Sequence, residues 1–173
     1  DWVWEVDKDG KYTFASESVK ENLGYDCEEL IGKTPFELMP EDEAKRVSEV
    51  FRVIASEKKP IIDLENWNVT KEGKRVCLFT NGVPILNEKG ELCGYRGVDK
   101  DITEKKHAQK ALKESEQNYR TLVESSTDAI LITDNERKIV SCNQAFLNLF
   151  GYRAEEVEGK STRLMHVSDD SFD

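Results

Sequence analysis

The amino-acid sequence contains one long internal repeat. Residues 24–33, GYDCEELIGK, return as residues 151–160, GYRAEEVEGK. The separation of the two copies is far longer than the period of a solenoid or of a hairpin array, so the repeat indicates a duplicated domain. The second copy matches only the front half of the first. We therefore expect a complete domain, a connector and the N-terminal part of a second domain, in residues 1–103, 104–125 and 126–173.

The composition limits the class of protein. Of 173 residues, 38% are hydrophobic and 35% are charged, which is typical of a globular protein. The net charge of −10 argues against a nucleic-acid partner, which favours a basic face. The four cysteines are scattered without a CxxC pair, and no apolar run approaches the roughly 20 residues that span a membrane. We expect a cytoplasmic module with no metal, no nucleic acid and no direct membrane contact, although its parent protein could be membrane-anchored.

The hydrophobic pattern predicts an α+β fold. Residues 16–30 have the caps and glycines of short helices, and a longer helix begins at Pro40. Two strands precede these helices and three follow them, which implies one antiparallel sheet with helices on one face. Strands are expected at residues 2–7, 12–15, 61–69, 75–86 and 91–99.

One dipeptide within the fourth strand has two interpretations. Asn81-Gly82 is typical of a tight hairpin turn. However, more strand-like residues and a better turn at residues 87–90 follow it. We therefore favour a continuous strand with a kink or bulge.

The connector is expected to be a helix that runs to about Glu124. Asp101 and Glu104 have the spacing of a capping box, and Thr103 is an alternative cap. Small and apolar residues recur at steps of four and three, which predicts a seam for pairing with a second copy of the helix. The alternative is a helix that lies against its own domain. The seam residues are Ala108, Leu112, Ser115, Tyr119 and Leu122.

Four features of the chain occur together, in an order and spacing that resemble one protein family. They are the Asp-turn-strand openings at Asp7 and Asp134, the GYxxEExxGK motif of both copies, Gly82-x-Pro84 in a late strand, and Asp101-Ile102-Thr103. With these features the chain resembles a tandem pair of PAS sensor domains. The resemblance covers a whole domain in residues 1–104 and the front half of another in residues 126–173.

This resemblance implies a five-stranded antiparallel sheet, in the order 2-1-5-4-3, around a pocket roofed by short helices. Asp101, Ile102 and Thr103 would join the sheet to a signalling helix. The implied function is that of a sensory and signal-relay module in a larger protein, for which the first candidate is a sensor histidine kinase. The module would form a homodimer and act on output domains of its own polypeptide. Two alternatives remain open: a ligand-free dimerisation or spacer module, and the input region of a diguanylate cyclase.

The resemblance also bears on cofactors. Flavin-binding members of the family carry a reactive cysteine after the second short helix, whereas residues 32–38 contain none and Cys27 lies too early. Haem-binding members use a histidine that residues 41–65 lack. His166, in the second copy, is more typical of a surface loop than of a ligand. Flavin and haem are therefore disfavoured, and the cofactor stays unknown: a small organic ligand or a filled core without one.

If a pocket exists, mostly apolar residues should line it. The candidates are Phe51, Ile54, Ile62, Leu64, Cys77, Phe79 and Tyr95, with Trp67, Asn81 and Arg96 at its edges.

The sequence contains no recognisable catalytic constellation. It has no phosphate-binding loop, no HExxH pair and no nucleophile elbow. Glu28 and Glu29 are adjacent, so on a helix they do not face each other as a catalytic pair would. His107 is followed by Ala-Gln-Lys rather than by the His-Glu-x-x-x-Pro pattern of a phosphoacceptor helix. Any enzymatic activity is therefore expected in output domains and not in this chain.

Overall fold

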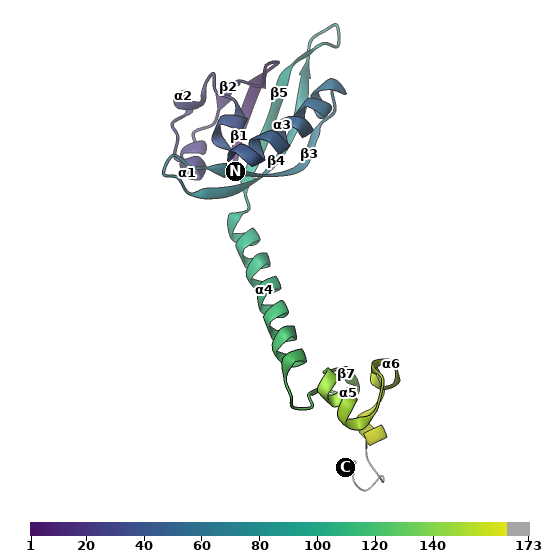
Figure 1. Cartoon of the computed structure of the whole chain (residues 1–173). Helices are drawn as coiled ribbons and strands as arrows, with labels where there is room; N and C mark the ends of the chain where they lie inside the picture. Colours follow the sequence, from purple (N-terminus) through teal and green to yellow (C-terminus); the bar gives the residue numbers. More distant parts are fainter. Residues whose placement is uncertain (166–173) are drawn as a thin grey trace. The chain divides into compact units, whose positions relative to one another are not determined.

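The computed structural model describes residues 1–165. The chain divides into two compact units, Asp1–Ala108 and Gln109–Asp173, each with a β-sheet of its own. The first sheet has five strands, and the second, within the described residues, has two (Figure 1).

The first unit is built on one antiparallel sheet in the order β2-β1-β5-β4-β3. Its first strand therefore lies beside its last, and residues from both ends of the unit meet in the middle of the sheet. The strands are β1 (Trp2–Asp7), β2 (Tyr12–Ala15), β3 (Ile61–Val69), β4 (Arg75–Leu86) and β5 (Leu92–Asp101). This sheet and its strand order confirm the predicted fold.

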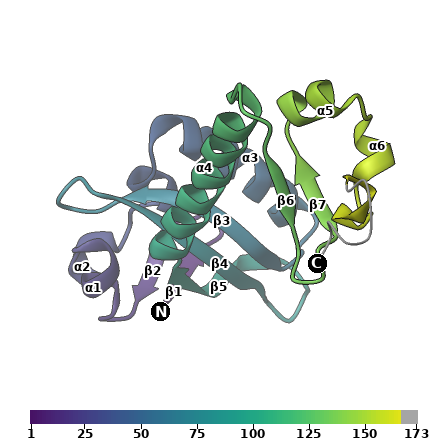
Figure 2. The same cartoon turned by 90° about the horizontal axis from the view of Figure 1, so that it is seen from below.

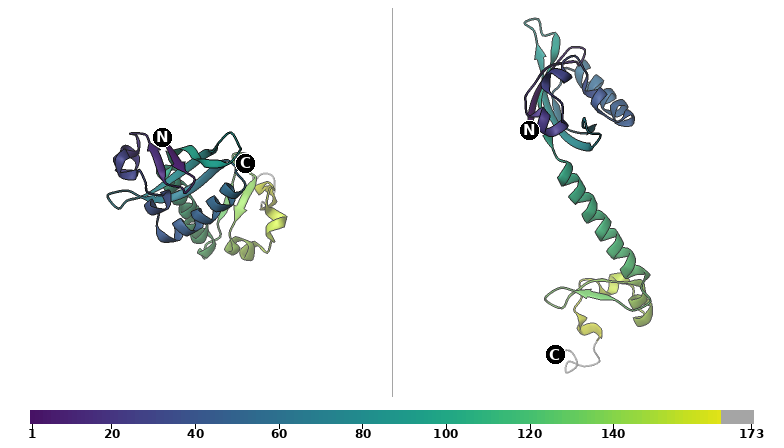
Figure 3. Two further views of the ribbon diagram at one scale, coloured as in Figure 1. Left: turned by 90° about the horizontal axis from the view of Figure 1, so that it is seen from above. Right: turned by 90° about the vertical axis from the view of Figure 1, so that its left-hand side faces the viewer.

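Helices cover one face of this sheet (Figures 1 and 3). Each turns apolar side chains inward, among them Leu23, Leu30 and Val47, all of which are buried. Because these segments are short, most of their stability comes from that packing rather than from helix propensity. They are α1 (Val19–Leu23), α2 (Cys27–Leu30), the 3₁₀ helix η1 (Pro35–Leu38) and α3 (Glu41–Ser56).

The middle of the sheet depends on a tryptophan packed over glycines. Trp4 of β1 is 4% exposed, and its ring lies against Gly97 of β5 and Gly82 of β4. A Cβ atom at Gly97 would lie 2.5 Å from that ring and 2.3 Å from the Asn81 carbonyl oxygen. Only glycine leaves room for the indole here, so Gly97 determines where Trp4 lies.

The prediction of a continuous fourth strand is confirmed. β4 runs through Asn81 and Gly82, and Gly82 pairs with both Ile61 and Gly97. The irregularity lies opposite, in β3, where the register shifts between Ile61 and Leu64. There Asp63 has a φ of 51°, and its N–H donates to Asn81 Oδ1 at 3.0 Å. Asn81 therefore supports a bulge in the neighbouring strand.

The connector helix α4 spans Thr103–Ser125 and carries no buried residue. Its first turns belong to the first unit and the remainder to the second. No helix within residues 1–165 is long and apolar enough to cross a membrane.

The second unit repeats the opening of the first. A two-stranded antiparallel sheet is followed by short helices (Figure 2). Ile139, Phe146 and Val157 form its buried apolar residues. The elements are β6 (Leu131–Thr133), β7 (Ile139–Cys142), α5 (Gln144–Phe150), α6 (Ala154–Val157) and the 3₁₀ helix η2 (Thr162–Met165).

Candidate functional site

A cavity of about 50 Å³ lies in the first unit, between the inner face of the sheet and the helices. Most of its wall is apolar and includes four aromatic side chains, those of Trp4, Tyr12, Phe36 and Phe51. A mostly apolar hollow with a few convergent polar groups is the usual form of a small-molecule site. The polar side chains of the wall are Asn66 and Asn68 of β3, Thr80 of β4 and Asp99 of β5.

Asp99 is the acidic group of this cavity, and it is 5% exposed. Its Oδ1 accepts a hydrogen bond from Trp4 Nε1 at 3.0 Å, and the Thr80 hydroxyl also bonds to the carboxylate. Burial raises the pKa of Asp99 from 3.8 to about 6, although both hydrogen bonds lower it. Burial, together with the Asp99 charge, also raises the pKa of Tyr12 well above its ordinary value. At neutral pH the cavity therefore holds a carboxylate that burial has deprived of water.

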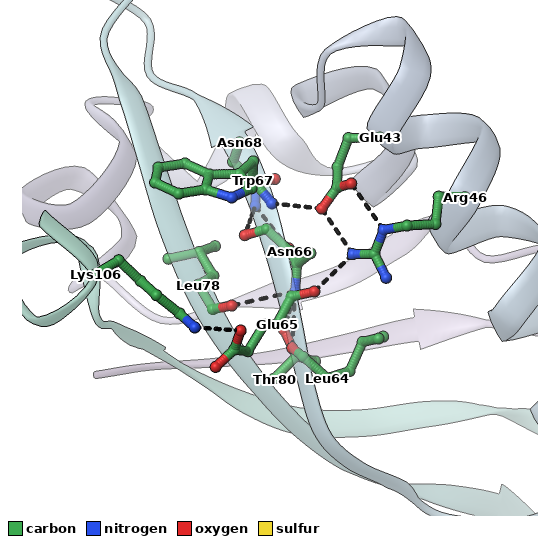
Figure 4. Close-up of polar contacts among 10 residues, drawn as sticks. All are labelled: Glu43, Arg46, Leu64, Glu65, Asn66, Trp67, Asn68, Leu78, Thr80 and Lys106. Carbon is green, nitrogen blue, oxygen red and sulfur yellow. Dashed lines mark hydrogen bonds and ion pairs between the residues drawn. The ribbon is translucent and has the colours of Figure 1, made fainter. Parts of the chain in front are cut away.

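A chain of hydrogen bonds leads from Asp99 to the edge strand. Asn66 Nδ2 donates to Thr80 Oγ1 at 2.8 Å, and Asn68 Nδ2 donates to Asn66 Oδ1 at 2.6 Å. Both asparagines are at most 3% exposed. Figure 4 labels these asparagines and Thr80 and draws their hydrogen bonds, and all three line the cavity. Buried polar groups that satisfy one another in this way hold neighbouring strands in one register.

The other face of β3 contacts the beginning of α4. Successive side chains of a strand point to opposite faces, so Glu65 and Trp67 alternate with the cavity-lining asparagines. Lys106 Nζ lies 2.6 Å from Glu65 Oε2 (Figure 4). The rings of Trp67 and His107 meet edge to face, with centroids 6.4 Å apart. One strand thus touches the cavity on one side and the exit helix on the other.

Helix α3 holds the outer edge of β3. Glu43 Oε1 accepts a hydrogen bond from the Trp67 N–H at 2.9 Å, and Arg46 Nη2 donates to the Glu65 carbonyl oxygen at 2.7 Å (Figure 4). Arg46 also binds Glu43 in a bidentate pair, which is the main reason that the pKa of Glu43 is lowered. These bonds give backbone groups of an edge strand the partners that a further strand would supply.

The segment from Asp101 to Thr103 joins β5 to α4. Asp101 Oδ1 accepts hydrogen bonds from both the N–H and the hydroxyl of Thr103. Thr103 Oγ1 accepts from the Cys77 N–H at 2.9 Å, and the Ile102 N–H donates to the Cys77 carbonyl oxygen at 2.9 Å. The start of the helix is thereby bonded to β4, the strand next to the edge strand β3. The predicted capping box with Glu104 is not the arrangement found, because Asp101 bonds to Thr103.

Comparisons with known proteins agree with this geometry. A family model described as PAS domain matches residues 1–104, and a second model with the same description matches residues 117–173. The chain belongs to the PAS domain family.

The chain is also similar to proteins whose names describe a kinase and a sensor protein. Sporulation kinase E of Bacillus subtilis (strain 168) is 38% identical over 56 residues, which cover 32% of this chain and 8% of that protein. The virulence sensor protein BvgS of Bordetella pertussis is 31% identical over 71 residues, 41% of this chain and 6% of that protein. The chain thus spans less than a tenth of the length of either relative. A sensory box histidine kinase/response regulator from Burkholderia thailandensis E264 has a similar solved structure, with a TM-score of 0.55, 25% identity and coverage of 69% of this chain and 88% of that one.

Only part of the predicted PAS pocket lines the cavity. Phe51 and Leu64 do so. Tyr95 is buried beside them, 5.2 Å from Phe51 between ring centroids, and its hydroxyl bonds to the carbonyl oxygens of Ile54 and Lys59. Tyr95 and Ile54 therefore belong to the packed core that supports the PAS pocket rather than to its wall.

The other pocket candidates lie elsewhere. Leu64 pairs with Thr80 and Asn66 with Leu78, so the even-numbered residues of both strands face the cavity. The odd-numbered candidates on these strands therefore face the opposite side of the sheet. Ile62, at the β3 bulge, is 69% exposed, and Arg96 of β5 is exposed. The candidates on the opposite side are Trp67, Cys77, Phe79 and Asn81.

Sequence reasoning missed the four polar residues of the PAS cavity. Leu64, Asn66 and Asn68 alternate with Glu65 and Trp67, and that period-two pattern was the available signal. Asp99 gave no signal of its own, because an aspartate near the end of a strand is usually solvated.

Side chains that can ligate a metal do not gather in the part of the PAS chain that the structure describes. No group of three or more His, Cys, Asp or Glu side chains in residues 1–165 is arranged to hold a metal ion. His107 contacts Trp67, and His166 lies outside the described residues.

The predicted seam lies on the open surface of α4. All five of its residues are exposed, and Leu112, Tyr119 and Leu122 are 62%, 58% and 70% exposed. The helix thus carries an apolar stripe that no other side chain among residues 1–165 covers, and its pairing with a second copy stays a prediction.

Proposed function

We propose that this chain is the sensory and signal-relay module of a larger signalling protein. The class of protein that we propose first is a sensor histidine kinase. The cavity and β3 would form the input, and α4 would carry the output to domains of the same polypeptide. The names of the relatives support this proposal, since Sporulation kinase E and BvgS are a kinase and a sensor protein. The chain itself would catalyse nothing. In this proposal it lies in the cytoplasm, where its cysteines stay reduced.

One observation carries the proposal: β3 contacts the cavity with Asn66 and Asn68 and contacts α4 with Glu65 and Trp67. A ligand that moves the asparagines also moves the groups that hold the first turns of the helix. The Glu65–Lys106 pair is partly exposed, with 47% and 29% of the two side chains accessible. Such a pair contributes only about 0.5 kcal/mol. A contact this weak can be exchanged for another without unfolding the domain, as a relay element requires.

The second contact between sheet and helix is the bonded segment of residues 101–103. It fixes the direction in which α4 leaves β5, because Cys77 of β4 bonds to both Ile102 and Thr103. A change in the register of β4 would therefore turn the helix. The exposed seam on α4 would transmit that turn to the same helix of a second chain, in a parallel homodimer.

The relay is tested in the full-length protein by measuring autophosphorylation. Thr103→Val removes the hydroxyl that bonds to Cys77 and Asp101, and Glu65→Gln removes the ion pair. Both should change the basal activity at least threefold. Glu72→Gln is the matched control, because Glu72 pairs with Lys74 within one turn of the sheet and does not touch α4. Activities equal to that of the control would contradict the relay.

The dimer is tested separately. Replacement of both Leu112 and Leu122 by Ser should shift the chain from dimer to monomer in sedimentation analysis. Replacement of Lys110 and Lys113 by Ser, away from the seam on the same helix, should leave the dimer intact. A dimer that survives the first change would show that α4 does not pair through this stripe.

The competing proposal is a spacer that only dimerises and has a filled core. The cavity and its buried carboxylate favour the sensor, because a module with no ligand gains nothing from an ionisable group inside its core. A ligand that raises the unfolding temperature would distinguish the two, since binding to the folded state stabilises it by mass action.

A further inference from the structure

The cavity has an electrostatic imbalance. Among the side chains of its wall, only Asp99 and Tyr12 titrate, and no Lys, Arg or His is among them. Asp99 lies on β5 and Tyr12 on β2. The side chains that β1, β3 and β4 present to the cavity are all uncharged, and the polar ones among them are Trp4, Asn66, Asn68 and Thr80. Helix α3 and η1 add apolar side chains alone. A buried carboxylate is normally paired with a cation, and in the described residues this one is not.

The rest of the wall is suited to a particular kind of cation. Four aromatic side chains line a hollow of about 50 Å³, and aromatic walls beside a negative charge attract organic ammonium groups. Since roughly 10–15 Å³ holds one water-sized group, this volume takes a ligand of about four non-hydrogen atoms. A larger head group would not enter without movement of the helices.

The hydrogen-bonding groups of the cavity wall further limit which kind of ligand can bind. The Trp4 indole and the Thr80 hydroxyl take two of the roughly four acceptor positions of the Asp99 carboxylate, so positions remain for a donor. Asn68 is 2% exposed; its Nδ2 is occupied by Asn66, and among the described residues no donor meets its Oδ1. Apart from the Tyr12 hydroxyl, the free polar groups of the cavity wall are therefore acceptors, which favours a ligand that donates hydrogen bonds.

We propose that the first-unit cavity binds a small organic ammonium ion, with its N–H group on the Asp99 carboxylate and its alkyl groups against the aromatic wall. This inference rests on the proposed function, since it assigns a ligand class to the input site of that sensor. Binding would supply the missing countercharge, and contacts with Asn68 and Asn66 would pass its effect to β3.

Calorimetric titration of the whole 173-residue chain tests the proposal, with trimethylammonium chloride as the probe. The comparison ligands are isopropanol, which is of similar size but uncharged, and acetate, which is of similar size but negatively charged. At pH 7 we expect saturable binding of trimethylammonium that neither of the others shows. No saturable binding of trimethylammonium, or equal binding of isopropanol, would overturn the proposal.

Two further measurements assign the binding to Asp99. Asp99→Asn keeps the shape of the side chain and should weaken binding at least tenfold, whereas Glu72→Gln removes a carboxylate from the turn between β3 and β4, away from the cavity, and should leave it unchanged. In the unaltered chain, affinity at pH 5 should be about one tenth of that at pH 7, because a carboxyl group with a pKa of about 6 is then mostly protonated. Unchanged affinity in Asp99→Asn would overturn the assignment. Equal affinity of the unaltered chain at pH 5 and pH 7 would also overturn it, and this second measurement does not depend on how well the variant folds.

This test is independent of the relay. Calorimetry reports binding alone, whereas the Thr103 and Glu65 variants report coupling to the output domains. Relay variants that alter kinase activity without any ammonium binding would make the ligand class wrong and leave the sensor proposal standing.

Discussion

The two units use the same local sequence but bury it in different ways. Each copy has an aspartate that accepts a hydrogen bond from the N–H four residues later. The Lys11 N–H donates to Asp7 Oδ1 at 2.9 Å, and the Lys138 N–H donates to Asp134 Oδ1 at 2.8 Å. Gly32 and Gly159 end the second short helix with φ values of 85° and 72°. Turn and cap chemistry therefore produces the same structure twice, whatever follows it in the chain.

Burial is where the units differ. Trp4 of the first unit is 4% exposed, because β5 pairs with β1 and Gly97 receives the indole. Its counterpart in the repeat is Leu131, in a two-stranded sheet, and Leu131 is only partly buried. An isolated pair of strands is at best marginally stable, so the second unit depends on packing from other elements for its stability. The comparison teaches that the repeated motif specifies shape, and that a core requires additional strands.

The largest expected effect is at the buried tryptophan. Trp4→Ala should lower the free energy of unfolding of the first unit by about 4 kcal/mol, since it leaves a cavity under the sheet. The matched change Leu131→Ala should cost about 1 kcal/mol, because that side chain is only half-buried. Urea titration monitored by residue-resolved NMR measures both units. Equal losses would contradict the difference in burial.

Asn143 is the next test, and it sharpens the comparison from the other side. It is fully buried; its Oδ1 accepts from the N–H groups of Ile130 and Phe146, and its Nδ2 donates to the carbonyl oxygens of Val123 and Asp128. Asn143→Ala should lower the stability of the second unit by about 3 kcal/mol, because it leaves buried backbone groups unpaired.

Its counterpart in the first unit is Ser16, whose Oγ accepts one hydrogen bond, from the Val3 N–H. Ser16→Ala should therefore cost only about 1 kcal/mol. Hydrogen exchange at the last turn of α4 should accelerate in Asn143→Ala alone. Unchanged exchange there would mean that Asn143 does not tie the helix to the second unit.

Asp99 tests the part of the first unit that has no counterpart among the described residues of the second. Folding raises the pKa of Asp99 from 3.8 to about 6. At a pH between these two values, the folded state therefore holds a proton that the unfolded state has released. Stability due to this group is thus highest below pH 4, falls as pH rises to about 6, and is level above that.

An asparagine does not titrate, so Asp99→Asn should remove this pH-dependent loss of stability. The free energy of unfolding of the variant, relative to that of the unaltered chain, should therefore rise by about 2 kcal/mol from pH 4 to pH 7. Denaturant unfolding at both pH values measures the difference, and the subtraction cancels the other carboxylates. A difference that does not depend on pH would contradict a raised pKa at Asp99.

The smallest effect is expected where the units agree. Asp7→Ala and Asp134→Ala each remove the acceptor of a turn and should cost about 1 kcal/mol in their own unit. Unequal losses would show that the turn depends on its tertiary surroundings, against the common geometry of the two copies.

Much of the first unit could be read from the residues themselves. Strands β3 and β4, the long helix after Pro40 and the exit helix from Thr103 follow from hydrophobic period and caps. Of the residues predicted for the pocket wall, Phe51 and Leu64 line the cavity, whereas Trp67, Cys77, Phe79 and Asn81 face the other side of the sheet. A strand's pattern tells which residues share a face, but a one-residue error in choosing the inner face exchanges the whole set.

What the sequence by itself determined is therefore local: two copies of a turn, two sets of short helices, and the family to which the repeat belongs. The tertiary structure decided which faces meet. Asp99 became a buried, uncompensated carboxylate only because β5 returns to the middle of the sheet beside Trp4, and Asn66 and Asn68 became part of a cavity wall only when α3 closed over them. Such burial arises from contacts between residues far apart in the chain, and no local pattern contains that information.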